Sequence, residues 1–285
     1  MSPNNIELEI SKIKNLPPLP EESIKIITAI NDPDITVEAL VDVLSFSPVL
    51  VARLLGLANS AFFGRAGKIN DLRIAIIQVL GLNLVKSLVL SIVLNVELNT
   101  SKCKNFDPEF FWGHALVTAL LAQKLSKDLE GELMQPNIIY TSGLLLNIGL
   151  LASIFIFPSE LNDVFSKSDP VEGSVFDELN SVVGKSQYEI GGILLERWKL
   201  PPVYQNIVKQ FRQSAFQGEE RHVIELLELS HWVAAYIVTD KVDQLPDFSD
   251  TLAQLSIPKS TFIQVVDDTF KNKDNIQELA SVISG

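Results

Sequence analysis

Apolar residues recur at helical spacing along most of the chain, and no stretch of strand length alternates convincingly between apolar and polar positions. In the segment 48–58, four apolar residues share one helical face: Val51, Leu54, Leu55 and Ala58. Residues 82–98 are apolar on nearly all sides, which is typical of a helix at the centre of a protein. We therefore predict an all-α, multi-helical fold with almost no sheet.

Capping residues and prolines predict where these helices begin and end. Thr36 is placed to cap a helix, and Ser47 followed by Pro48 is a second start signal, because Ser can accept a free amide hydrogen and Pro loses no bond there. Ser186 and Glu189 form a capping-box pattern. We predict helices at residues 21–30, 48–58, 74–80, 82–98, 108–129, 136–157, 159–165, 174–183, 187–200, 203–212, 220–239, 252–255 and 259–270.

A polar stretch at residues 99–105 interrupts the helical pattern and is our candidate boundary. Asp107 and Pro108 then restart a helix with an acidic first turn. The division gives an amino-terminal helical part at 1–104 and a second helical part at 105–285. We expect the two parts to form one structural unit.

Two segments are apolar enough to raise the question of a membrane span. Residues 80–98 carry several polar side chains, and residues 143–158 are shorter than the roughly 20 residues that a bilayer requires. We interpret both as buried helices and expect no membrane association. The amino terminus lacks the basic start and apolar stretch of a secretion signal, so we expect a cytoplasmic protein.

The formal net charge of −12, with 23 Lys and Arg spread along the chain, argues against direct nucleic-acid binding because a phosphate backbone would be repelled. A single cysteine, Cys103, excludes an intrachain disulfide, and we interpret it as an incidental thiol. Glycine-rich phosphate loops and the Gly-x-Ser-x-Gly turn of serine hydrolases do not occur in the sequence.

A series of short motifs, in this order and spacing, resembles the HDOD family of bacterial signalling modules related to HD-type phosphohydrolases. The motifs in the first part are Leu16-Pro17-Pro18-Leu19-Pro20, Ser47-Pro48-Val49-Leu50, Leu57-Ala58-Asn59-Ser60-Ala61-Phe62-Phe63-Gly64, Ala75-Ile76 and Leu80-Gly81. Those in the second part are Phe111-Trp112-Gly113-His114, Gly143-Leu144-Leu145-Leu146-Asn147-Ile148-Gly149, Glu189-Ile190-Gly191-Gly192 and Arg197-Trp198-Lys199-Leu200-Pro201. The resemblance spans residues 16–239.

The resemblance implies an amino-terminal helical part packed on a part like the HD hydrolases, which hold metal with a His, a His-Asp pair and a later Asp. By motif, His114 stands at the first His, Leu146-Asn147 replace the His-Asp pair and His231 replaces the final Asp. Gln187 stands where the family often carries His. We therefore expect no catalytic residue, no metal site and no cofactor, and predict that the chain is not an enzyme.

These vestigial-pocket positions have two interpretations. His114 and His231 are either hydrogen-bonded histidines facing a neighbouring helix or part of a remnant pocket that binds a small ligand. Asn147 either makes a structural hydrogen bond or contacts that ligand, since a buried amide needs partners. A cation such as Arg197 or Arg212 lining the pocket would favour an anionic, nucleotide-like ligand.

The turn at residues 59–64 is the second candidate site. Its residues Asn59, Ser60, Phe62 and Phe63 end one helix and present two aromatic rings. The rings fit either the core or an interaction surface for a partner.

Our leading hypothesis is a non-catalytic signalling or scaffold protein that binds other signalling proteins. The alternatives are a small-ligand sensor that uses the vestigial pocket and a residual metal-dependent phosphohydrolase. The sequence leaves open the partner, the input signal, homodimer formation and relative motion of the two parts.

Overall fold

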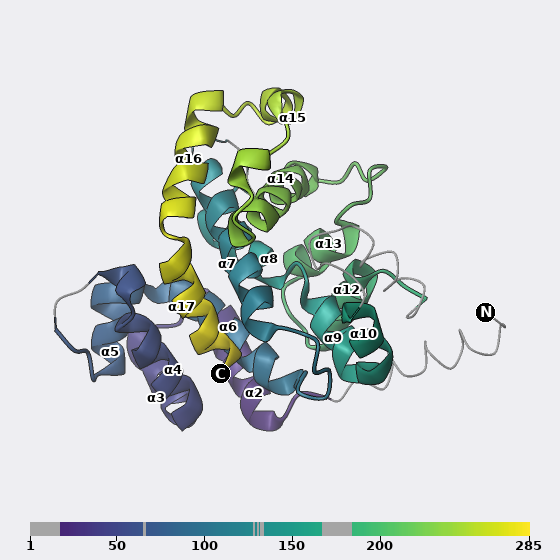
Figure 1. Ribbon diagram of the computed structural model, residues 1–285. Coiled ribbons are helices and arrows are strands. Elements are labelled where there is room, and N and C mark those ends of the chain that lie inside the picture. Colours follow the sequence, from purple (N-terminus) through teal and green to yellow (C-terminus); the bar gives the residue numbers. More distant parts are fainter. Residues whose placement is uncertain (1–17, 65–66, 128, 130, 132–133, 167–183) are drawn as a thin grey trace.

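A computed structural model describes residues 18–64, 67–127, 129, 131, 134–166 and 184–285 (Figure 1). No strand occurs in this part of the chain, and helices joined by short turns make up most of it. The predicted all-α fold is confirmed. The helix predicted at 174–183 lies outside the described residues.

The first part consists of short helices. These are α2 (Glu21–Asn31), α3 (Val37–Ser45), α4 (Pro48–Ala58), the 3-10 turn η1 (Ala61–Phe63), α5 (Leu72–Ala75), the π-helical stretch η2 (Ile76–Leu80) and α6 (Leu82–Glu97). The Thr36 hydroxyl accepts a hydrogen bond from the Ala39 amide, as predicted for a cap. The Ser47 side chain makes no such bond, so of the two predicted start signals of α4 only Pro48 at the first helical position is present.

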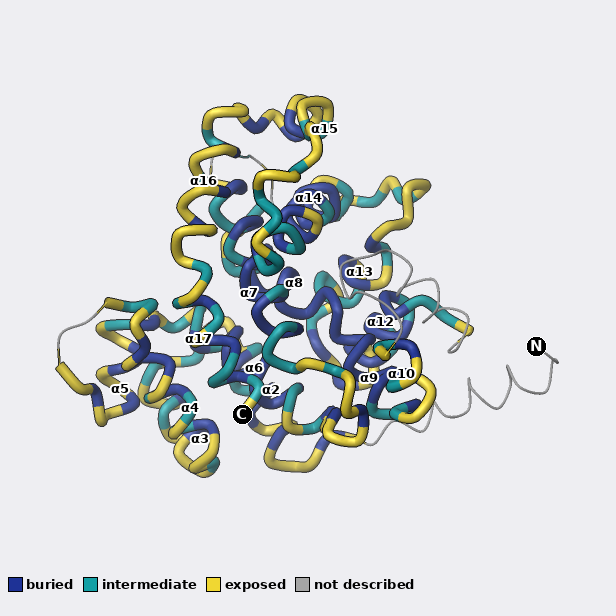
Figure 2. The backbone as a smooth tube through the Cα atoms, in the orientation of Figure 1, coloured by how far each residue is buried: buried dark blue, intermediate teal, exposed yellow. Residues whose placement is uncertain are grey.

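The second part is organised around α7 (Pro108–Leu125), which packs against α8 (Pro136–Leu145), α14 (Arg221–Val238) and helices of the carboxy terminus. Figure 2 shows α7, α8 and α14 as mostly buried, whereas α3 and α16 expose much of their surface. The remaining helices of this part are α9 (Ile148–Ile156), α10 (Pro158–Phe165), α12 (Gln187–Arg197) and α13 (Pro202–Gln210). The capping box at Ser186 is confirmed, with both of its hydrogen bonds formed.

The single helix predicted at 136–157 is wrong, because a turn at Leu146 and Asn147 divides it into α8 and α9. Beyond the turn, α9 crosses α12 at very short range. A Cβ atom on Gly149 would lie 1.8 Å from the Gln187 carbonyl oxygen and 2.5 Å from the Gly191 amide nitrogen. Only glycine permits this approach, and it brings the turn against the start of α12.

The carboxy-terminal elements are η3 (Val242–Gln244), α15 (Ser249–Gln254), α16 (Lys259–Lys271) and α17 (Lys273–Ser284). The sequence prediction missed α17, although Ile276, Leu279, Ala280 and Ile283 recur at helical spacing and are buried. This helix contacts α7 of the second part as well as α4, α6 and η1 of the first (Figure 1). The two parts therefore pack together through α17 across the predicted boundary, and the boundary itself stays a prediction.

One helical stretch, Pro136–Ile156, is long and apolar enough to cross a bilayer, and the bent pair Leu72–Leu80 and Leu82–Glu97 would pass the same test if taken as one span. Within Pro136–Ile156, 89% of the most apolar window is buried inside the protein. Such burial is characteristic of a core helix.

Candidate functional site

The fold brings together the residues that the sequence assigned to a vestigial pocket. His114 comes from the middle of α7, His231 from α14, Asn147 from the turn before α9 and Gln187 from the first turn of α12. We refer to these four residues and Leu146 as the HD-like site. Leu146, Asn147, Gln187 and His231 are buried, and His114 is partly buried.

The two histidines contact each other directly. Their rings lie edge to face with centroids 4.6 Å apart, and His114 Nε2 is 3.1 Å from the backbone carbonyl oxygen of His231. A carbonyl oxygen only accepts, so this hydrogen bond requires the proton on His114 Nε2. The tautomer of His114 is therefore set by the backbone of α14.

Both rings are held neutral at physiological pH. Burial lowers the pKa of His114 to about 4; the hydrogen bond to His231 opposes this shift and the nearby Arg212 guanidinium adds to it. Burial also lowers the pKa of His231 well below its ordinary value, with His114 and Arg212 acting in the same direction. No carboxylate contributes to the pKa shift of either ring. In catalytic metal sites, by contrast, a carboxylate commonly orients the imidazole ligand.

Asn147 and Gln187 pair with each other rather than with the histidines. The Gln187 side-chain amide donates to Asn147 Oδ1 over 3.1 Å, and both residues are less than a tenth exposed. The oxygen of Asn147 is the only group that Leu146-Asn147 could offer to a cation, and it already accepts a hydrogen bond. The close crossing of Gly149 and Gly191 places these two amides in contact.

Aromatic and cationic side chains surround the HD-like site. Phe211 packs against His231 with centroids 5.5 Å apart and against Tyr188 at 4.8 Å. The exposed Arg212 guanidinium lies between 5.6 and 6.0 Å from the ring centroids of Tyr188, Phe211 and Trp232. Arg197 is exposed on the last turn of α12, so of the two candidate cations Arg212 is the one whose charge reaches the histidines.

No group of three or more His, Cys, Asp or Glu side chains that could hold a metal ion occurs within the described ranges. A metal ion at the HD-like site would have the His114 and His231 rings as ligands and no carboxylate. A hydrolytic metal centre usually combines three protein ligands with one open position for water. The residues of the HD-like site do not fit that requirement.

Hydrogen bonds hold the second candidate site, the turn at residues 59–64, in place. The Asn59 amide donates to the carbonyl oxygens of Leu55 and Ile69, and its oxygen accepts from the Ile69 amide over 2.8 Å. Ser60 is buried, and its hydroxyl has no hydrogen-bond partner among the described residues. From α17, the Glu278 carboxylate accepts from the Ala61 amide over 3.1 Å.

Phe62 and Phe63 are partly buried and lie edge to face with centroids 5.0 Å apart. They line a cavity between the two parts of the molecule. Both rings also pack against the hydrophobic core, and their use as an interaction surface stays a prediction.

The family model described as HDOD domain matches residues 16–214. A crystal structure from Shewanella amazonensis SB2B, described as a candidate phosphohydrolase, is 25% identical with a TM-score of 0.73 and covers 96% of this chain and 97% of that one. An HDOD domain protein of unknown function from Geobacter sulfurreducens is 20% identical with a TM-score of 0.62, over 93% of this chain and 98% of that one.

Two further matches are longer than this chain. A candidate signal transduction protein from Marinobacter aquaeolei VT8 is 24% identical with a TM-score of 0.80, and the match covers 99% of this chain but 66% of that one. An uncharacterized protein of Treponema pallidum (strain Nichols) is 28% identical over 220 residues, which are 73% of this chain and 41% of that protein. The chain thus spans less than half of the Treponema protein.

Proposed function

Because the chain belongs to the HDOD family, we propose that it is a non-catalytic signalling module that acts by binding other proteins. The observation that carries this proposal is Leu146, fully buried where HD hydrolases have the His of their His-Asp pair. An aliphatic side chain has no donor atom for a cation. Its neighbour Asn147 has its oxygen occupied by Gln187.

The chemistry of the remaining groups supports the same proposal. Metal-assisted hydrolysis requires a cation that lowers the pKa of a bound water, and that cation is normally held by several nitrogens or carboxylates. His114 directs Nε2 at a backbone carbonyl, and the two neutral rings lie edge to face. The name of the Shewanella relative concerns phosphohydrolysis, but this chain lacks the matching ligands at three of four positions.

Exposed apolar side chains of the first part support protein binding. Phe46, between α3 and α4, is 81% exposed, and large apolar side chains at least 40% exposed also occur on α2, α4, α5, η2 and α6. These residues are Ile24, Phe46, Val49, Ile74, Ile77 and Val96. We expect a protein partner to cover some of these side chains, because the centre of a protein interface is richer in apolar residues than its rim.

Metal content of the purified protein, combined with turnover of nucleotides and cyclic dinucleotides in the presence of Mn²⁺, tests the absence of catalysis. We expect metal well below one equivalent and no turnover above the protein-free background. Stoichiometric metal or turnover that is lost in both His114→Ala and His231→Ala would overturn the proposal. Trp232→Ala is a suitable control, because Trp232 is exposed on the same helix as His231.

Protein binding is tested by capture with the purified chain as bait. The double variant Phe46→Ser/Ile77→Ser removes two exposed apolar groups of the first part, and Ile263→Ser removes one of 50% exposure on α16. We expect one reproducible partner to be retained by the wild type and by Ile263→Ser and lost by the double variant. Equal retention by both variants, or no reproducible partner, contradicts the proposal.

A second candidate function, sensing of an anionic small molecule at the HD-like site, is favoured by Arg212 alone. Its guanidinium lies close enough to lower the pKa of both histidines. A titration with ATP, GTP and cyclic di-GMP, repeated on Arg212→Gln, separates this function from protein binding. Saturable binding lost in that variant would favour the sensor.

A further inference from the structure

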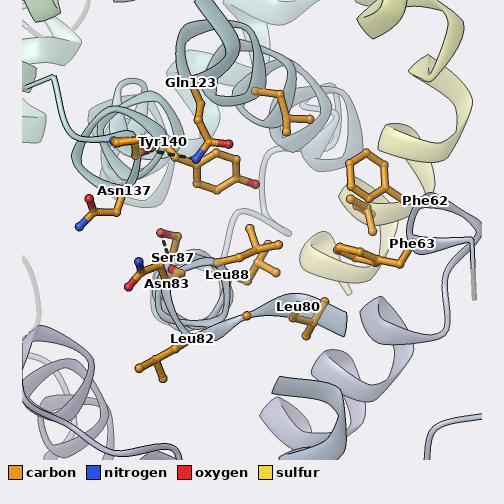
Figure 3. Close-up of a pocket in the computed structure, with 15 residues that line it drawn as sticks. Phe62, Phe63, Leu80, Leu82, Asn83, Ser87, Leu88, Gln123, Asn137 and Tyr140 are labelled. Atoms are coloured by element: carbon orange, nitrogen blue, oxygen red, sulfur yellow. Dashed lines mark hydrogen bonds between the residues drawn. The ribbon is translucent and has the colours of Figure 1, made fainter. Parts of the chain in front are cut away.

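A cavity of about 470 Å³ lies between the first and second parts of the molecule, away from the residues of the HD-like site (Figure 3). Its walls come from η1, from the turn into α6, from α7 and α8, and from Leu279 of α17. Its volume falls within the range of small-molecule sites, which is roughly 300–1,000 Å³. We refer to it as the Tyr140 cavity.

Tyr140 of α8 distinguishes this cavity from a packing defect. The residue is only 4% exposed. Burial alone raises the pKa of its hydroxyl, and no hydrogen bond to a described residue contributes to that shift. Figure 3 shows its ring projecting from α8 into the cavity, with the hydroxyl directed toward the side of Phe62 and Phe63. The hydroxyl is therefore available to water or to a ligand that enters the cavity.

Two other polar side chains at the cavity, Gln123 and Ser87, are engaged within the protein. The Gln123 side-chain amide donates to the Pro136 carbonyl oxygen over 3.1 Å. The Ser87 hydroxyl is 2.7 Å from the hydroxyl of Thr141, to which it is hydrogen-bonded. Tyr140 is thus the deeply buried lining residue whose polar group is still available.

The remaining lining sets the chemistry of the occupant. Leucines 80, 82, 84, 88, 120 and 279 and the rings of Phe62 and Phe63 supply most of it, and no Lys, Arg, Asp, Glu or His is among the described lining residues. A charged ligand would lose its hydration without gaining an ion pair. Aromatic side chains on one side offer edge and face contacts to a planar ring.

From this geometry we infer that the Tyr140 cavity binds an uncharged, largely apolar small molecule with at least one aromatic ring and one polar atom that hydrogen-bonds to the Tyr140 hydroxyl. Its contacts span both parts, since Phe62 and Leu88 belong to the first part and Tyr140 to the second. A bound ligand therefore stabilises the packing of the first part against the second. This site is independent of the function proposed for the HD-like site.

Two fluorescent probes that differ by one sulfonate test the inference on the full chain. N-phenyl-1-naphthylamine is neutral, and 1-anilinonaphthalene-8-sulfonate is its anionic counterpart. We expect saturable one-to-one binding of the neutral probe and at least tenfold weaker binding of the anion. Absence of saturable binding of the neutral probe, or equal affinity for the two probes, would overturn the inference.

Three variants locate the bound probe. Tyr140→Phe removes only the hydroxyl and should weaken binding about three- to tenfold, the value of one hydrogen bond. Asn83→Trp fills the mouth from an exposed position and should abolish binding. Phe46→Ala removes an aromatic ring that is 81% exposed elsewhere on the first part and should change nothing.

Each variant can contradict the inference separately. Unchanged affinity in Tyr140→Phe overturns the role of the hydroxyl, and unchanged affinity in Asn83→Trp places the probe outside the cavity. Loss of binding in Phe46→Ala would mean that the probe sits on the exposed surface. Thermal unfolding of every variant, without probe, shows that a lost signal does not come from a lost fold.

Discussion

The HD-like site and the Tyr140 cavity share one helix, α7, and differ in how closely the elements around them pack. At the HD-like site His114 bonds to the His231 carbonyl oxygen and Gln187 bonds to Asn147, and the glycine crossing of α9 and α12 leaves no room between these helices. Around Tyr140 the walls stand apart, and a hydroxyl makes no hydrogen bond within the described residues. The residues of the HD-like site are thus part of the packed interior, whereas the Tyr140 cavity lies between the two parts.

The largest effect is expected from Gly149→Ala, which breaks the packed side of this comparison. The new Cβ would lie 1.8 Å from the Gln187 carbonyl oxygen, so α9 and α12 must separate. We expect a loss of more than about 3 kcal/mol in the free energy of unfolding, measured by urea denaturation.

The matched control for that variant is Gly56→Ala on α4, whose Cβ would find Val282 Cγ1 at an ordinary 3.7 Å. A helical alanine should stabilise by about 0.5–1 kcal/mol relative to glycine. Equal, small effects at the two positions would refute the close crossing.

A second prediction concerns pH. The pKa of His114 is about 4 in the folded protein and near 6.5 when unfolded, so the unfolded chain binds more protons between these values. Stability is unaffected by this group above pH 6.5 and falls as the pH drops from there toward 4. Each pKa unit corresponds to about 1.4 kcal/mol, so the shift contributes at most about 1.8 kcal/mol between pH 7 and pH 5. After allowance for the partial exposure of His114 we expect a loss of about 1 kcal/mol.

His114→Gln isolates this contribution from that of the carboxylates. The variant should show a shallower fall of the free energy of unfolding over the same pH range. Identical pH profiles for wild type and variant would show that the ring is not held neutral. Tyr140, with a pKa raised by burial, does not titrate in this range, so the acid response distinguishes the two regions.

A third prediction concerns the amide pair. Asn147→Leu removes the acceptor of the Gln187 amide and leaves a buried donor unpaired, which should destabilise by about 1–3 kcal/mol. The other single variant is Gln187→Leu. The double variant Asn147→Leu/Gln187→Leu removes both partners and should regain part of that loss. A double-mutant cycle by thermal unfolding measures the coupling, and strictly additive effects would mean that the pair does not interact.

The smallest effect is expected from Tyr140→Phe in the absence of any probe. Because its hydroxyl bonds to no described residue, its removal should change the free energy of unfolding by less than about 0.5 kcal/mol. Calorimetric unfolding measures this difference. A loss above about 1 kcal/mol would indicate a structural hydrogen bond and make the two regions alike.

Local signals in the sequence predicted most helices. The Ser186 capping box, the Thr36 cap and the proline starts act within one turn, so they can be read from neighbouring residues. The missed helix α17 carries an equally clear apolar period, and attention to Ile276, Leu279 and Ile283 would have found it. The division of 136–157 into α8 and α9 has no local signal, since no Gly or Pro stands at Leu146-Asn147.

The sequence by itself determined the all-α class and the family, because these depend on residue types and their spacing. Only the tertiary structure decided that Asn147 bonds to Gln187, 40 positions away, and that His114 bonds to the backbone of His231, 117 positions away. It also turned Phe62 and Phe63 toward a cavity that α8 and α17 complete. Helical period and capping act over a few residues, whereas the partner of a buried polar group is fixed by how distant helices pack.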